Sequence, residues 1–383
     1  MKPKSLLALT TALFLGLTVP AKALDTAATS AMVVDFETGA VLLEKDAHRP
    51  IPPASMSKLM TLNMLFEALQ DGRFALDDTF TVSEKAWQKG GSKMFLEPRH
   101  RPTIEDLIRG IIIHSGNDAC IVVAENLAGS EDAFAALMTQ RALELGMEDA
   151  HFANSTGWPH PDHRMSAFDL VQLGKRMIRD FPEYYPYFAE SEFTWDGITQ
   201  SNRNPLLYTS TVGDGLKTGH TEEAGYGLVG SAAQGDRRVV MMVTGLESSR
   251  ARAIESERLT AWAFREFENI TVMEAGTIAA EAPVWIGTAD TVPLMVMEDI
   301  RATIPRGAED SVTAMAVFDG PLPAPIAEGQ IVGELIISIP DMADISRPLY
   351  AANAVAEGGF MTRVSAAAGL LARDAMTTVF GSE

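Results

Sequence analysis

The sequence predicts an α/β domain built on an antiparallel sheet, followed by a small all-β sandwich and a C-terminal amphipathic helix. Strand-type segments lie at both ends of the first part, and helical patterns fill its middle. After about residue 272 the pattern changes to short β-type runs separated by Gly, Pro and Asp, which is typical of a sandwich. We therefore expect two domains, at 24–270 and 271–357, and a tail at 358–383.

The first 23 residues have the pattern of a secretory signal peptide. Lys2 and Lys4 precede an uncharged stretch at 5–19, and residues 20–23 read PAKA, a small-x-small cleavage pattern. No cysteine follows this site. We expect a mature chain that begins at Leu24 and is exported without a lipid on its N-terminus.

The elements of the first domain can be assigned in order along the chain. A hairpin is expected first, with its turn at 37–39, and a helix over 55–70 follows, because apolar residues recur there every three or four positions before Gly72. The remaining segments are helical patterns at 103–145 and 166–180, strands at 225–233 and 237–246, and a helix at about 256–267.

The tail opens with Gly358-Gly359 and carries one apolar helical stripe. The stripe consists of Phe360, Val364, Ala368, Leu371, Ala375 and Val379, while two arginines and an aspartate lie off it. Such a helix can lie in a membrane interface, or it can dock on its own domain. The pattern alone leaves both readings open.

Charge and cysteine content exclude some classes of function. The chain has 31 basic and 51 acidic residues and therefore a net charge of −20. This charge argues against binding to nucleic acid because the phosphate backbone would be repelled. The single cysteine, Cys120, rules out an intramolecular disulfide. Its helical, apolar surroundings favour a small buried residue over a reactive thiol.

Ser55 and Lys58 are the first candidates for chemistry. On a helix, positions i and i+3 share a face, so the lysine amine can reach the serine hydroxyl. Lysine acts as a base if burial or a nearby cation lowers its pKa. A helix N-terminus also favours a developing oxyanion. Taken alone, Ser-x-x-Lys is a weak signal, although it occurs once in this chain.

Two further triplets strengthen the signal. Ser115-Gly116-Asn117 ends an apolar run with a hydroxyl and an amide, and Lys217-Thr218-Gly219 offers an ammonium and a hydroxyl on an expected strand. Gly219 leaves room for a ligand to pair with the strand edge. The order Ser-x-x-Lys, Ser-x-Asn, Lys-Thr-Gly, at separations of 60 and 102 residues, makes the set specific.

With these motifs, the sequence resembles the penicilloyl-serine transferase superfamily, and within it the low-molecular-mass penicillin-binding proteins that are serine D-Ala-D-Ala carboxypeptidases. The resemblance extends to "FANSTGW", "SNRNPLLY" and "KTGHT", and to the β-rich domain and the amphipathic end. It implies a penicillin-binding fold, periplasmic location, attachment to the inner membrane through the tail, peptidoglycan pentapeptide as substrate, and β-lactams as covalent inhibitors.

The resemblance also implies a role for each motif residue. Ser55 would be the acylated nucleophile, Lys58 its base, and Ser115 the proton relay to the leaving amine. The substrate would be held by Asn117, Lys217, Thr218, Gly219, His220, Arg252 and Arg203. Among these, the backbone N–H groups of Ser55 and His220 would form the oxyanion hole, and Arg252 would help to bind the carboxylate. For Arg203 a surface salt bridge is an equally good reading.

Several other activities compete with that of a carboxypeptidase. A serine β-lactamase of the best-known class would need a Glu-x-x-Leu-Asn loop, which the sequence lacks. A DD-endopeptidase would use the same residues, and a wall-binding scaffold would not need three intact motifs. A metallopeptidase would need ligands such as His160, Asp162 and His163, which are better read as turn residues. We therefore expect neither a metal nor a cofactor.

Overall fold

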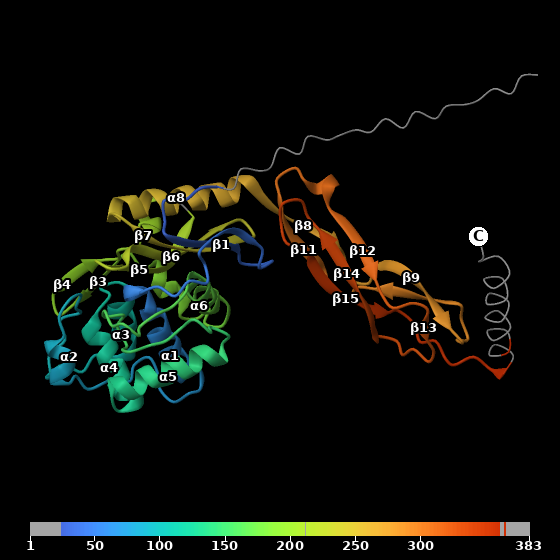
Figure 1. Ribbon diagram of the computed structural model, residues 1–383. Coiled ribbons are helices and arrows are strands. Elements are labelled where there is room, and N and C mark those ends of the chain that lie inside the picture. The colour runs from blue at the N-terminus through green and yellow to red at the C-terminus, as the bar shows by residue number, and fades with distance from the viewer. Residues whose placement is uncertain (1–23, 211, 361–363, 365–383) are drawn as a thin grey trace, which may run out of the picture.

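The structure, a computed structural model, describes residues 24–210, 212–360 and 364 and contains two domains (Figure 1). The predicted signal peptide lies outside the described residues, as does most of the predicted tail helix. The first domain is α/β and the second is built of strands. None of the helices that the structure describes is long and apolar enough to cross a membrane.

A five-stranded antiparallel sheet organises the first domain, in the order β2-β1-β7-β6-β5. The N-terminal hairpin forms one side, and its first strand pairs with β7 from the far end of the domain. The prediction of a sheet assembled from both ends is therefore confirmed. Its strands are β1 (Ser30–Asp35), β2 (Val41–Lys45), β5 (Gly213–Thr221), β6 (Gly225–Gln234) and β7 (Arg237–Leu246).

Helices cover both faces of this sheet (Figure 1). Val240 and Met242 on β7 pack into the core beneath α1 and α6, whereas Met241 and Val243 pack against α8. Successive side chains of a strand point to opposite faces. A strand that is covered on both sides therefore needs the continuous apolar run seen in β7.

One of the predicted helical segments of the first domain is interrupted in the structure. The predicted segment 103–145 is three helices, because Ser115-Gly116 and Gly129-Ser130 interrupt it. The helices are α1 (Lys58–Gln70), α2 (Glu84–Gln88), α3 (Ile104–Ile112), α4 (Asn117–Ala128), α5 (Glu131–Glu144), α6 (Ala167–Arg179), α7 (Leu206–Thr209) and α8 (Ser249–Glu266). A small hairpin, β3 (Glu192–Trp195) and β4 (Ile198–Ser201), precedes α7.

The start of α8 corrects the prediction of a helix from about residue 256. The helix begins at Ser249, since the Ser248 side chain caps it by accepting a hydrogen bond from the Ala251 amide. Polar and charged residues dominate the first two turns, so the apolar pattern did not reveal them. The correction matters because Arg252 lies in that missed part of the helix.

The second domain packs a six-stranded sheet, β12-β14-β15-β10-β9-β13, and a two-stranded ribbon, β11-β8, around one apolar core. α8 ends at Glu266 and β8 begins at the next residue, so position 270, where we expected the boundary, lies inside this strand. The strands are β8 (Phe267–Met273), β9 (Ile278–Trp285), β10 (Thr291–Met295), β11 (Ile300–Pro305), β12 (Thr313–Val317), β13 (Leu322–Pro323), β14 (Ile331–Ser338) and β15 (Ile345–Ala351).

A buried polar cluster joins the two domains. The Asp35 carboxylate accepts hydrogen bonds from Arg237 Nε at 2.9 Å and from Asn269 Nδ2 at 3.2 Å. Thr303 Oγ1 donates to Asn269 Oδ1, and Thr303 also contacts Thr38 in the β1–β2 turn. The β8–β11 ribbon is therefore held against the hairpin of the first domain.

Candidate active site

Ser55 lies in a 3₁₀ turn, η1 (Ala54–Ser57), which runs directly into α1. The sequence predicted one helix over 55–70, but the first turn is tighter. In a 3₁₀ turn, positions i and i+3 eclipse each other, and Lys58 Nζ lies 2.8 Å from Ser55 Oγ, to which it donates. Ala54, just before the serine, has a φ of +49°, a conformation that non-glycine residues adopt at a cost.

The environment of Lys58 suits a base. The side chain is completely buried, and burial, aided by the positive charges of Arg203 and Lys89, lowers its pKa from 10.5 to about 8. The negative charge of Asp118 acts in the opposite direction. A substantial fraction of Lys58 is therefore neutral near pH 8 and can accept a proton.

A loop between α5 and α6 lies directly behind this pair. Lys58 Nζ donates a second hydrogen bond, of 2.6 Å, to the carbonyl oxygen of Thr156. The next residue, Gly157, has a φ of +76°, and a Cβ there would lie 1.9 Å from the Ala54 carbonyl oxygen. Only glycine fits where the loop presses against η1.

Ser115 and Lys217 form a second hydroxyl–amine pair. Lys217 Nζ donates to Ser115 Oγ at 3.0 Å, and both side chains are buried. Burial and the positive charge of Lys58 lower the pKa of Lys217 well below its usual value. Ser115 itself has a φ of +56°, so it occupies a strained loop position just before α4.

Asn117, the first residue of α4, is fixed by the segment that follows α2. Its backbone N–H donates to the Ser92 carbonyl at 2.8 Å, and its Nδ2 donates to the Gly90 carbonyl at 2.9 Å. Arg203 Nη1 donates to Ser92 Oγ at 2.7 Å. The structure therefore places Arg203 beside the motif residues, where its charge also lowers the pKa of Lys58.

The Lys-Thr-Gly motif lies on β5, at the edge of the sheet. A Cβ at Gly219 would lie about 3.0 Å from the Pro53 carbonyl oxygen and from Met56, so β5 runs closely along the turn that carries Ser55. Thr218 is buried, whereas the side chain of His220 is exposed and stacks on Tyr226 at 3.8 Å between ring centroids. An edge strand beside the serine can pair with an extended ligand.

Arg252 approaches the same strands from α8. Its Nη1 lies 3.5 Å from the carbonyl oxygen of Gly227, which is the residue paired with Gly219 on β6. Arg252 is 8% exposed, its Nε has no hydrogen-bond partner among the described residues, and no described acidic side chain forms an ion pair with it. Burial lowers its pKa to about 10. A buried cation without an acidic partner suits an anionic ligand.

Three contributors to this arrangement escaped the sequence analysis. The Thr156 carbonyl and the Ser92 carbonyl act through the backbone, which carries no residue-type signal. Asp118 is fully buried and accepts hydrogen bonds from the Met94 and Leu96 amides. Its place directly after Ser-Gly-Asn was visible, but nothing distinguished it from a surface acid in the first turn of a helix.

Among the described residues, no group of three or more His, Cys, Asp or Glu side chains could hold a metal ion. His163 is buried, its Nδ1 accepts a hydrogen bond from the Ala153 amide, and burial lowers its pKa to about 3. His160 and Asp162 are exposed. The prediction for Cys120 holds, since the thiol is buried and its pKa is raised to about 12.

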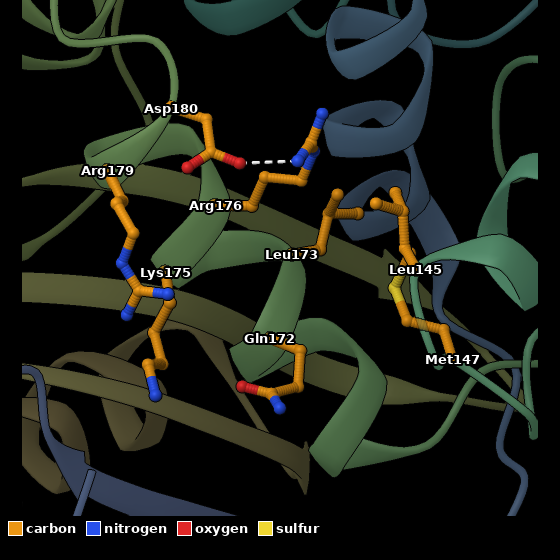
Figure 2. A pocket seen from close by; sticks show the side chains of 8 residues that line it. All are labelled: Leu145, Met147, Gln172, Leu173, Lys175, Arg176, Arg179 and Asp180. Atoms are coloured by element: carbon orange, nitrogen blue, oxygen red, sulfur yellow. Dashed lines mark hydrogen bonds and ion pairs between the residues drawn. The ribbon is translucent and has the colours of Figure 1, made fainter. Parts of the chain in front are cut away.

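One further pocket, of about 170 Å³, lies over α6, away from these motifs (Figure 2). Lys175 and Arg179 extend from one side of the helix, while Leu145 and Met147 lie on the other. It contains none of the predicted site residues. The predicted catalytic residues gather instead where η1, β5 and the start of α4 meet.

Comparisons with known proteins identify the family of the chain. Residues 18–248 match the family described as D-alanyl-D-alanine carboxypeptidase, Peptidase_S11, and residues 267–357 match the penicillin-binding protein 5 C-terminal domain. The chain is 38% identical over 345 residues to D-alanyl-D-alanine carboxypeptidase DacA of Escherichia coli K12, covering 88% of this chain and 86% of that protein. It is 39% identical to DacC of the same strain, over 91% and 88%.

The fold is likewise shared with a solved structure. Penicillin-binding protein 5 from Haemophilus influenzae aligns with a TM-score of 0.79 and 35% identity, covering 89% of this chain and all of that one. The family resemblance expected from the motifs and the penicillin-binding fold are both confirmed. The chain belongs to the Peptidase_S11 family of D-alanyl-D-alanine carboxypeptidases and carries that family's penicillin-binding protein 5 type of C-terminal domain.

Proposed function

We propose that the protein is a serine D-alanyl-D-alanine carboxypeptidase that removes the terminal D-alanine of peptidoglycan pentapeptides. One observation carries the proposal: a buried lysine of lowered pKa lies 2.8 Å from Ser55 Oγ, and a second buried hydroxyl–amine pair, Ser115 and Lys217, lies near enough for the two lysines to interact electrostatically. Family membership supports the same activity, since the similar proteins carry that name.

Acylation begins when neutral Lys58 accepts the Ser55 proton. The alkoxide oxygen attacks the carbonyl carbon of the penultimate D-alanine, and the negative charge develops on the carbonyl oxygen. The backbone N–H groups of Ser55 and His220 are the proposed donors to this oxyanion. The pKa of about 8 suits a group that must take and return a proton near neutral pH.

Collapse of the tetrahedral intermediate expels D-alanine. The leaving amine takes up the proton that Lys58 received from Ser55, which leaves Lys58 neutral again, and Ser115, hydrogen-bonded to Lys217, is the proposed relay. Water then attacks the acyl-enzyme ester, with Lys58 as the base, and Ser55 is released. The two steps together consume one water molecule and regain the free enzyme.

Substrate binding rests on charge and on the strand edge. The substrate ends in a carboxylate, and Lys217, Thr218 and Arg252 would bind it. In a chain with a net charge of −20, such a group needs a local cationic pocket. The peptide backbone would pair with the edge of β5, and Asn117 would position the substrate amide. A β-lactam carries a carboxylate next to a reactive amide and would acylate Ser55 in the same way.

The test is release of free D-alanine from a peptide that ends in D-Ala-D-Ala. We expect release by the wild-type chain, no release by Ser55→Ala, and no effect of EDTA. The same samples should be offered a cross-linked muropeptide dimer. Faster cleavage of the dimer than of the pentapeptide would make the protein an endopeptidase, and cleavage of neither would refute the proposal.

We also propose export through residues 1–23 and attachment of residues 358–383 to a membrane surface. Both segments are supported by their sequence patterns. Deleting residues 358–383 should move the protein from the membrane fraction to the soluble fraction and leave D-alanine release from small peptides unchanged. Unaltered fractionation would favour a tail helix that docks on its own domain.

A further inference from the structure

Glu131 is a buried carboxylate that the proposed chemistry does not use. It is the first residue of α5 and is 6% exposed. A helix N-terminus stabilises a negative charge, but a surface position would satisfy that need without burial. Burying a carboxylate is unfavourable unless hydrogen bonds and an opposite charge compensate. The contacts of Glu131 therefore need an explanation.

Both carboxylate oxygens of Glu131 are engaged by other segments. Oε1 accepts hydrogen bonds from the backbone N–H of Ser155 at 3.2 Å and from its Oγ at 2.9 Å. Oε2 lies 3.0 Å from Lys85 Nζ on α2. A satisfied polar network in a low-dielectric interior is rigid. Glu131 thereby fixes the loop that carries Ser155.

That loop supplies the acceptor for the proposed base. Ser155 is followed by Thr156, whose carbonyl oxygen accepts the 2.6 Å hydrogen bond from Lys58. The Ser155 carbonyl in turn accepts a 2.6 Å hydrogen bond from Thr61 on α1, one turn after Lys58. A shift of Ser155 therefore moves the atom that aims the Lys58 amine at Ser55.

The same carboxylate also contacts α2 through Lys85. α2, which carries Lys85, leads into the segment whose Gly90 and Ser92 carbonyls hold Asn117. The Lys85–Glu131 ion pair thus ties the loop behind Lys58 to the segment beside Asn117. Lys85 is half exposed, so the ion pair itself is the weaker link, and the two hydrogen bonds to Ser155 are the stronger one.

We propose that Glu131 is a positioning residue for acylation: through Ser155 it holds the Thr156 carbonyl that aligns Lys58 with Ser55. This inference rests on the proposed function, because it assigns Glu131 a part in the Ser55 reaction. Misplacing a reacting group by about 1 Å can slow a reaction by about 100-fold. The effect belongs to the chemical step, since Glu131 touches none of the proposed carboxylate-binding groups.

The experiment follows the labelling of the full chain by a fluorescent penicillin over time, and the rate of labelling is measured at several penicillin concentrations. This separates the acylation rate constant from the dissociation constant of the initial complex. For Glu131→Ala we expect acylation slower by about 10- to 100-fold and a dissociation constant within about threefold of wild type. Glu131→Gln should recover most of the rate, since its amide oxygen still accepts from Ser155.

Asp132→Ala is the matched control, because it removes an exposed carboxylate one residue further along the same helix turn. It should label at the wild-type rate. Ser155→Ala removes one of the two hydrogen bonds and should slow acylation by a smaller factor. In the double variant with Glu131→Ala it should add nothing further, because the two act through one contact.

The inference is overturned if folded Glu131→Ala acylates at the wild-type rate, or if Glu131→Gln is as slow as Glu131→Ala. Should Glu131→Ala fail to fold, Ser155→Ala decides, and an unchanged rate there also overturns it. A wild-type chain that is never labelled would instead refute the proposed function, so the two failures are distinguishable.

Discussion

The two domains differ in what they bury. Among the described residues, buried polar and charged side chains occur throughout the first domain. In the second domain, Thr303 is the one polar side chain that is buried. Thr303 belongs to the joint with the first domain. The strand domain therefore has an apolar core, and the α/β domain combines such a core with a polar network.

This difference indicates that apolar burial stabilises both domains, whereas the buried polar groups of the first domain serve its reaction. Apolar burial stabilises a fold at about 25 cal/mol per Å², whereas a buried polar group costs free energy unless it is hydrogen-bonded. The first domain accepts that cost around Lys58, Lys217 and Arg252. We infer that the polar network is retained for the reaction, and that the second domain can be weakened without changing the chemistry of the first.

Removing the base should have the largest effect on acylation. In Lys58→Met we expect labelling by penicillin to slow by about 1,000-fold or more, because Ser55 loses its proton acceptor. The free energy of unfolding should change little. The variant loses the hydrogen bond to Thr156, but it no longer buries an ammonium, which costs about 3 kcal/mol at 1.36 kcal/mol per pKa unit. A variant that unfolds would show instead that Lys58 is structural.

The pH dependence should be the next largest effect. Lys58 must be neutral to accept a proton, and its pKa is about 8, so protonation at lower pH removes the base. Acylation should rise about tenfold per pH unit up to pH ~7.5 and level off above pH ~8.5. A profile that is flat between pH 6 and 9, with the fold intact by circular dichroism, would contradict Lys58 as the base.

A smaller effect is expected for Arg252→Gln. The substitution removes the charge that would bind the substrate carboxylate but leaves Ser55 and Lys58 untouched. We expect KM for a D-Ala-D-Ala peptide to rise about tenfold, with kcat changed less, because a charge-assisted hydrogen bond contributes about 1.5–3 kcal/mol. Arg250→Gln, which removes an exposed cation two residues earlier on α8, is the control. A pure loss of kcat would place Arg252 in the chemical step instead.

The second domain should show no effect on acylation at all. Leu294→Ala, in the middle of its core on β10, should destabilise that domain by about 2–5 kcal/mol. The labelling rate of Ser55 at a temperature below the unfolding transition should remain that of wild type. A slower rate would mean that the joint at Asp35 and Thr303 transmits changes to the predicted catalytic residues.

The sequence predicted the sheet and the motif residues because their signals are local. Apolar runs such as that of β7 identify strands, and Ser55, Lys58 and the two triplets are recognisable residue types at fixed spacings. Arg203, which the sequence left between a site residue and a surface salt bridge, lies beside the motifs in the fold.

The remaining features could not be predicted because they depend on residues far apart in the sequence or on backbone groups. The start of α8 was missed because a serine cap and charged turns carry no apolar period. The Thr156 carbonyl that holds Lys58 is 98 residues away in sequence, and any residue type would supply it. The sequence also did not reveal the burial of Glu131, because an acidic residue in the first turn of a helix is common on protein surfaces.

The most direct test of the account is the mass of the chain after reaction with a penicillin. We expect one adduct of the mass of the intact penicillin, located by fragmentation on Ser55, in the wild-type chain. Ser55→Ala should carry none, while its circular dichroism and unfolding temperature match the wild type. An adduct that persists in Ser55→Ala, or that maps to Ser115, would contradict Ser55 as the nucleophile.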